Sequence, residues 1–404
     1  NNIIVDGSNT VGGTTRDLTI TNTSITAPNV IRVSSTGTTS LLNATVKNTV
    51  IVNGINSSSA VVAVDATNTA NPGYFNGLNF TNNEVKKSYI AFSLNSSTGN
   101  GNNVTVSNNK LNNSGVDAIR NGGINLTGFN GVTVSGNTIG NFDTATAEND
   151  YGIFISTGCS NTTVSNNTIS GLGMTSTFSS NAPFAIYVSS DILNSNISVT
   201  GNTITDISSV YGTTTAFPSG IFVTSATAGV TIEKNKISNI KNNYPTSARG
   251  AYGIRLGSSS TAASIIVKNN MIWDVATYSG SATLANNALG IYVATGAGYK
   301  IYNNTVNLGT QLSATGTINS AAFAVSSSIS VSGALDVQNN IFVNTQTTST
   351  TSCYTIYSAA ANTVFSTINY NDYWVPAGSN LGYLGSNRTA LADIVTGFGG
   401  NANS

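Results

Sequence analysis

The sequence predicts an all-β fold: a right-handed parallel β-helix, or solenoid, of about eleven coils with a short C-terminal capping helix. Three observations predict it. A strand motif that ends in Asn recurs along the chain, a second apolar strand lies between consecutive copies, and helical 3.6-residue periodicity is absent from both. Because one such unit is too short to bury its own apolar face, the units have to stack on one another.

The recurring motif is an alternating apolar strand followed by Asn or Gly, then Asn, a polar residue and an aliphatic residue. VTVSGNTI from Val132 is a clear copy, and looser copies begin at Leu18, Ala44 and Leu78. We expect the second Asn of each copy to occupy one turn in every coil and to hydrogen-bond its neighbours, because stacked amides form ladders and Asn tolerates the left-handed backbone of a corner. The predicted structural ladder is Asn109, Asn137, Asn167, Asn202, Asn235, Asn270, Asn304 and Asn340.

The second repeated strand has four residues, as in GIFI from Gly152 or GIRL from Gly253. Its third residue points outward, since the residues on either side point into the core. This column is rich in aromatic rings, which suit stacking on a glycan or docking on a partner surface, unless the long loops that follow the Asn column bury it. The predicted ligand-binding residues are Phe154, Tyr187, Phe222, Arg255 and Tyr292, in a column that begins Arg32, Ala63, Ser93, Asn125 and ends Ala324, Tyr357.

The remaining elements follow from the same pattern. Leucine-rich repeats and propeller blades have different sequence signatures, so these two repeat folds are not predicted. The predicted solenoid is right-handed because crossovers between parallel strands nearly always are. We expect the solenoid to cover residues 1–369 and a terminal coil and cap to cover residues 370–404. Within that cap, residues 388–399 predict a short helix with Thr389 as N-cap and a Gly stop.

Composition excludes several functions. Fifteen Lys and Arg balance fifteen Asp and Glu, and only 7% of residues are charged, against about 25% in ordinary chains. We therefore expect no nucleic-acid partner. With no His and two Cys, the chain cannot supply the four ligands of a usual His/Cys zinc site or form a Ser-His-Asp triad. No apolar run is long enough to span a membrane. The two cysteines, Cys159 and Cys353, lie six coils apart, too far for a disulfide.

The units resemble the parallel β-helix repeats of the pectate-lyase-like superfamily from about Ile3 to Asn369. That fold is shared by lyases, hydrolases, adhesins and spacers, so the resemblance implies a fold and leaves the function open. The segments 3–22 and 368–374 also resemble secreted or surface proteins that gliding bacteria export by type IX secretion. This implies an extracellular or cell-surface location, with secretion machinery or other surface proteins as partners. Asp143-Thr144-Ala145 resembles an O-glycosylation acceptor of that group, with Thr144 modified.

The sequence thus predicts a non-catalytic structural and adhesive module that binds a polysaccharide or cell-surface glycan. The alternative is a polysaccharide lyase or glycoside hydrolase, and its best constellation is Lys241, Arg249 and Arg255 near Asp206 and Asp274. No catalytic residue and no cofactor is expected. Calcium is the lesser alternative to no metal, at Asp143, Glu148 and Asp150, whose spacing is irregular for a calcium loop. One outward Thr column is interrupted at Ile266, Lys300 and Asp336, which argues against an ice-binding face.

Overall fold

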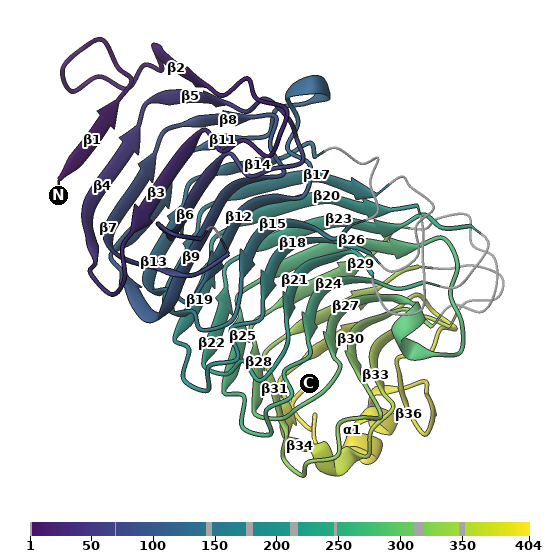
Figure 1. The fold of residues 1–404 in the computed structure, drawn as a ribbon. Helices are drawn as coiled ribbons and strands as arrows, with labels where there is room; N and C mark the ends of the chain where they lie inside the picture. Colours follow the sequence, from purple (N-terminus) through teal and green to yellow (C-terminus); the bar gives the residue numbers. More distant parts are fainter. Residues whose placement is uncertain are drawn as a thin grey trace.

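The computed structural model describes residues 2–68, 70–142, 148–174, 181–210, 217–245, 249–310, 319–346 and 352–404. The predicted fold class is confirmed: the chain is a parallel β-solenoid with one short C-terminal helix, and the two termini lie toward opposite ends of the stack (Figure 1). Each coil contributes one strand to each of three parallel sheets, which we call A, B and C. Sheet B alone has twelve strands, so the prediction of about eleven coils was close.

The strands follow one another in the order A, B, C in every coil, as their bounds show. Sheet A contains β1 (Ile3–Asp6), β4 (Leu41–Lys47), β7 (Gly73–Thr81), β10 (Val104–Ser107), β13 (Asn130–Ser135), β16 (Ser160–Ser165), β19 (Ile197–Thr200), β22 (Val230–Glu233), β25 (Ile265–Lys268), β28 (Tyr299–Tyr302), β31 (Leu335–Gln338) and β34 (Phe365–Asn369). Sheet B contains β2 (Leu18–Thr21), β5 (Thr49–Val52), β8 (Glu84–Lys86), β11 (Lys110–Leu111), β14 (Thr138–Gly140), β17 (Thr168–Met174), β20 (Thr203–Ser209), β23 (Lys236–Asn242), β26 (Met271–Thr277), β29 (Thr305–Leu308), β32 (Ile341–Asn344) and β35 (Asp372–Trp374). Sheet C contains β3 (Ile31–Ser35), β6 (Val61–Asp65), β9 (Ile90–Asn102), β12 (Gly122–Thr127), β15 (Asp150–Ile155), β18 (Pro183–Val188), β21 (Ser219–Val223), β24 (Ala251–Leu256), β27 (Ala288–Val293), β30 (Ala321–Val325), β33 (Tyr354–Ser358) and β36 (Gly382–Leu384), with β37 (Ser386–Arg388) antiparallel to β36.

The core consists of aliphatic columns that run along the solenoid. Val106, Val134, Val164 and Val199 are register partners on successive strands of sheet A, and all four are fully buried. Since parallel strands lie about 4.8 Å apart, identical side chains in neighbouring coils are in van der Waals reach. Strand alternation therefore separates an inner face, which repeats, from an outer face, which is free to vary.

The asparagine ladder lies at the turn between sheets A and B. Asn202 shows its geometry: the amide nitrogen donates to Asn235 Oδ1 at 2.9 Å and to the Val164 carbonyl at 3.0 Å, while Oδ1 accepts from the backbone N–H and the side-chain amide of Asn167 at 3.0 and 2.9 Å. All eight predicted asparagines have these contacts, and Asn83 and Asn371 extend the column at its two ends. Every amide hydrogen of Asn202 is thus used inside a dry turn.

The ladder residue itself does not have the left-handed backbone that the sequence analysis assigned to it. The residue before it does: Asn108 and Asn166 have φ of 56° and 54°, and Gly136 and Gly201 have φ of 65° and 66°. The two positions of the motif therefore have separate tasks. The first residue turns the chain, which favours Asn or Gly, and the second bonds between coils.

Two register predictions were wrong. The copy at Leu18 belongs to sheet B, where Leu18 pairs with Thr49, and the first strand of sheet A is β1, whose Ile3 pairs with Ala44. Apolar alternation alone does not distinguish the three strands of one coil. In sheet C, Arg32 pairs with Val62 and Ala63 is a buried core residue, because four consecutive apolar residues leave the phase of the strand undetermined.

The C-terminal helix α1 (Leu391–Phe398) covers the last coil. Ile394 and Phe398 are buried, and the Phe398 ring lies 5.5 Å from that of Phe365. Gly399 ends the helix with φ of 73°, as predicted. Ala390, not Thr389, is the N-cap, and the Asp393 carboxylate accepts hydrogen bonds from the backbone N–H groups of Thr389 and Ala390 at 3.1 and 3.0 Å, which is the second half of a capping box.

Replacing Asn202 by Leu is expected to lower the free energy of unfolding by roughly 3 to 5 kcal/mol, since four hydrogen bonds of about 1 kcal/mol each are removed. Chemical denaturation measures the change. Asn100→Leu is the matched control, because Asn100 is exposed and, among the described residues, its side chain donates one long hydrogen bond, of 3.4 Å. An Asn202 variant as stable as the control would contradict the ladder.

The two cysteines are buried and free, so alkylation without reductant should label neither thiol in the native protein and both in denaturant. Burial raises the pKa of each thiol to about 11, from about 8.5 in an unfolded chain. The native state therefore keeps these protons in a pH window where the unfolded state loses them, and the free energy of unfolding should fall as pH rises from about 8.5 to about 11. The double variant Cys159→Ala/Cys353→Ala should show a shallower fall; an equal slope would contradict the assignment.

Candidate functional site

The predicted aromatic column lies on the outer face of sheet C. Phe154, Tyr187, Phe222, Arg255 and Tyr292 are register partners on successive strands from β15 to β27. A second outward column, three residues earlier on each strand, adds further rings, and the two columns pack against each other at centroid distances near 5 Å. The rings of this second column are Tyr151, Phe184, Tyr252 and Tyr354.

Much of this face is covered. Phe222 and Tyr292 are only 8% and 5% exposed, and they belong to two small apolar clusters separate from the main core. Phe217 and Leu284, from the segments that lead into β21 and β27, complete the cluster around Tyr292. The structure thus favours burial of the column at these two positions. Phe154, Tyr187 and Arg255 are partly exposed, and their role in ligand binding remains a prediction.

Arg255 is held by ring faces. Its guanidinium carbon lies 4.4 Å from the Phe222 ring centroid and 5.4 Å from that of Tyr252, and within the described part of the chain its buried Nε has no hydrogen-bond partner. A cation–π arrangement satisfies the charge without a carboxylate. Burial also raises the pKa of Tyr187 and of Tyr292 above that of a solvated phenol. The face is apolar in character, with one cation embedded in it.

The residues considered for a catalytic site in the alternative function are only partly brought together. Asp206 and Asp274 lie two coils apart at one corner of the solenoid, with Asn239 in the coil between them. Asn239 donates a hydrogen bond to Asp206, and Lys241 forms an ion pair with Asp274 at 3.3 Å. Arg255 lies in the aromatic face of sheet C instead, and Arg249 packs over Tyr244 at 6.0 Å. Two coil spacings separate the carboxylates by roughly 10 Å along the axis, at the upper limit for inverting hydrolases.

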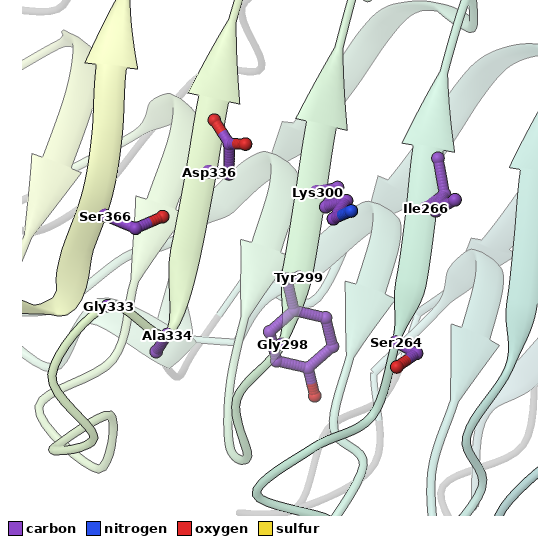
Figure 2. Close-up of a pocket in the computed structure, with 9 residues that line it drawn as sticks. All are labelled: Ser264, Ile266, Gly298, Tyr299, Lys300, Gly333, Ala334, Asp336 and Ser366. Atoms are coloured by element: carbon purple, nitrogen blue, oxygen red, sulfur yellow. The ribbon is translucent and has the colours of Figure 1, made fainter.

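A groove of about 230 Å³ opens on the outer face of sheet A across β25, β28 and β31 (Figure 2). It forms where the residues of one corner column become smaller. In earlier coils that corner holds Asn161 and Asn196, whose amides are bonded at 2.7 Å. In the later coils the register places Ser264 and Gly298 there, so the space is left open.

Polar groups of both charges line the groove around an aliphatic wall. Lys300 lies between Ile266 and Asp336 on neighbouring strands of one outward column, with its side chain exposed (Figure 2). Tyr302 and Gln338 donate to the Asp336 carboxylate, Gln338 Nε2 at 2.7 Å, and so hold it in place. Burial, together with this carboxylate, raises the pKa of Tyr302 to about 12.

The groove combines an ammonium group, a positioned carboxylate, the hydroxyls of Ser264 and Ser366, and an apolar side chain. Such a set can donate to and accept from the hydroxyls of a sugar while an aliphatic group contacts its C–H face. One carboxylate lines it, whereas hydrolysis by the usual mechanism needs two. The sequence analysis missed this groove, although its signal was the interruption of the Thr column at Ile266, Lys300 and Asp336.

The remaining predicted sites gain no support. Thr144 and Asp143 lie outside the described residues. Glu148 of the proposed calcium loop forms an ion pair with Arg120 at 2.5 Å, and the described segments contain no group of three acidic or thiol side chains suited to a metal. Among the described residues, no helix has the length and apolar character needed to cross a membrane.

No protein-family model matches the chain, and no curated protein does. Among solved structures, the chain is similar to that of XylC in complex with xylose, at 12% identity and a TM-score of 0.28, over 65% of this chain and 54% of that one. The chain therefore spans about half the length of that protein. A likeness this distant assigns neither a family nor a ligand.

Tyr292→Ala is expected to cost about 3 to 5 kcal/mol of stability, as for other large aromatic side chains removed from a packed cluster. The ring of Tyr292 lies 5.3 Å from that of Tyr252 and is almost fully covered. Tyr292→Phe keeps the ring and is expected to retain most of the stability. Thermal and chemical melting of both variants decide the matter, and an unchanged midpoint for the Ala variant would mean that the ring is free in solution.

Proposed function

We propose that the chain is a non-catalytic structural and adhesive module of an extracellular or cell-surface protein, and that it attaches to glycans. The observation that supports this most is the groove of Figure 2, where Lys300 and Asp336 present a donor and a fixed acceptor beside Ile266. Sugars are recognised by hydrogen bonds to vicinal hydroxyls together with apolar contact to one ring face. The groove offers both on a rigid sheet.

The remainder of the proposal concerns location and partners. A surface with few charges and a stacked, disulfide-free core suits an extended spacer that displays binding faces. We propose export by the type IX route, with secretion machinery or other surface proteins as partners, on the resemblance of segments 3–22 and 368–374 alone. Detection of the full-length protein on intact cells, and its loss in a strain that lacks that secretion route, would test this part.

Glycan binding is tested with Lys300→Met and Asp336→Asn. Each should weaken binding to the best ligand of a neutral and acidic oligosaccharide panel at least tenfold, since each removes one charge-assisted hydrogen bond at the groove. Lys268→Met is the matched control, because Lys268 lies on the same sheet, pairs with Glu233 at 3.2 Å and does not line the groove. Calorimetry measures the affinities, and wild-type affinity in both groove variants would exclude the groove as the site.

The alternative, a polysaccharide lyase or glycoside hydrolase, is favoured by one observation, the pair Asp206 and Asp274 two coils apart at one corner. Incubation with uronate and neutral polysaccharides, followed by detection of unsaturated products or new reducing ends, tests it. Turnover that is lost in Asp274→Asn but kept in Lys300→Met would replace the binding proposal with this one.

A further inference from the structure

Both tryptophans of the chain lie in one outward column of sheet B. The register pairs Trp273 with Asn307, Asn307 with Val343, and Val343 with Trp374, on the strands β26, β29, β32 and β35. The parallel column two residues earlier holds Met271, Thr305, Ile341 and Asp372. Figure 1 shows β23, β26 and β29 side by side on this face, away from the groove of sheet A. We call these eight residues the tryptophan face.

The large apolar side chains of this face are unusually exposed. Met271 and Trp374 are 50% and 52% exposed, and Trp273 and Ile341 are 36% and 43% exposed. Tryptophan is ordinarily among the more buried residue types on average, so two exposed copies in one column are informative. Within the described part of the chain, neither indole ring stacks on another aromatic ring of the protein. Four exposed large apolar side chains thus gather on one face, on both sides of Thr305 and Asn307, whereas the exposed apolar residues of a soluble protein are ordinarily scattered singly.

The size of the face decides what kind of ligand fits it. Three coil spacings separate the two tryptophans, about 14 Å, and the two columns lie about 7 Å apart along the strand. The face has eight residues, against the roughly 20 to 30 residues a side that a stable protein interface needs. A second copy of this chain is therefore a poor occupant. The long, narrow outline fits one linear chain that runs along the solenoid axis.

The chemistry of the face points to a sugar chain without charge. Indole rings stack on the C–H faces of pyranose rings, and Thr305 and Asn307 offer a hydroxyl and an amide between them. The face contains no cation: its one charged residue is Asp372, and the nearest Lys in the same column is Lys236, one coil beyond Met271. A carboxylated glycan would meet Asp372 without a compensating charge.

We propose that the tryptophan face binds a neutral glycan chain aligned with the solenoid axis, with Trp273 and Trp374 each stacked on one of its sugar rings. This deepens the proposed function and rests on glycan attachment, but it uses another face than the groove of sheet A. The backbone beneath the face is fixed, because all eight residues lie on paired strands of the stack. Its direction follows the coils, so longer oligomers bind more tightly than short ones until both tryptophans are covered.

Tryptophan emission provides a direct test, since the chain has two tryptophans and both lie on this face. Titration with hexamers of β-1,4-linked glucose and of β-1,4-linked xylose should shift the emission of the wild-type protein to shorter wavelength. Hexagalacturonate should not. Trp273→Ala and Trp374→Ala should each weaken binding of the preferred hexamer at least tenfold by calorimetry, with an unchanged melting temperature, and Trp273→Phe should restore part of the affinity.

Lys268→Met is the control, because Lys268 pairs with Glu233 and lies in neither the groove nor the tryptophan face. Loss of hexamer binding in the tryptophan variants, with binding kept in Lys268→Met, supports the tryptophan face. Wild-type affinity in the double variant Trp273→Ala/Trp374→Ala would overturn the inference while leaving glycan attachment through the groove intact. If no hexamer shifts the emission of the wild-type protein or binds to it in calorimetry, the tryptophan face is overturned, while the groove is judged separately by the wider oligosaccharide panel. An emission shift with hexagalacturonate alone would overturn the neutral ligand. A shift of the tryptophan emission that depends on protein concentration in the absence of sugar, together with dimers in analytical sedimentation, would overturn the proposal and show that the face binds a second copy of the chain.

Discussion

The hydrogen bond from one ladder asparagine to the next is the interaction on which the rest of the structure depends. Parallel strands would pair in several registers if apolar contacts alone decided, because a slide of two residues keeps the same face inward. An amide that must meet another amide at the turn removes that freedom. Asn167, Asn202 and Asn235 each donate to a carbonyl of an earlier strand as well, so the turn and the sheet are tied together. Every outward column inherits its alignment from this turn.

The fold could be predicted from the sequence because its determinants recur. The second Asn of each motif gave the ladder, and alternation gave the strands of each sheet. The sequence analysis assigned a strand to the wrong sheet, or a residue to the wrong face, where a repeat copy had no preceding copy to compare with or where a strand had no polar residue to mark its outward face. Leu18 matched the motif in composition but lies in sheet B, and Ala63 lies in a run of apolar residues that fits either phase.

The candidate sites were harder to predict, for a different reason. The aromatic column of sheet C was visible in the sequence, but its exposure depends on Phe217 and Leu284, which approach from segments outside the repeat. The groove of sheet A forms because the smaller residues Ser264 and Gly298 stand where earlier coils have asparagine, and no motif marks such a loss of side-chain volume. Trp273 and Trp374 are far apart in the chain and align only once the register of sheet B is known. The inward-facing columns repeat the same residue types and can therefore be predicted from the sequence, whereas the chemistry of an outward-facing column depends on single residues.

The ladder also gives the stack a direction. In each coil the asparagine offers its backbone N–H and its side-chain amide to the coil that follows, and the following coil supplies the oxygen. At the C-terminal end this demand is met by Asn401 and Ser404, which accept from the amide and the backbone N–H of Asn371. The two ends of the stack are therefore chemically different: an uncovered C-terminal edge exposes amide donors, whereas an uncovered N-terminal edge exposes the amide oxygen that accepts from them. Only a segment that supplies an acceptor, as Asn401 and Ser404 do, satisfies the C-terminal edge.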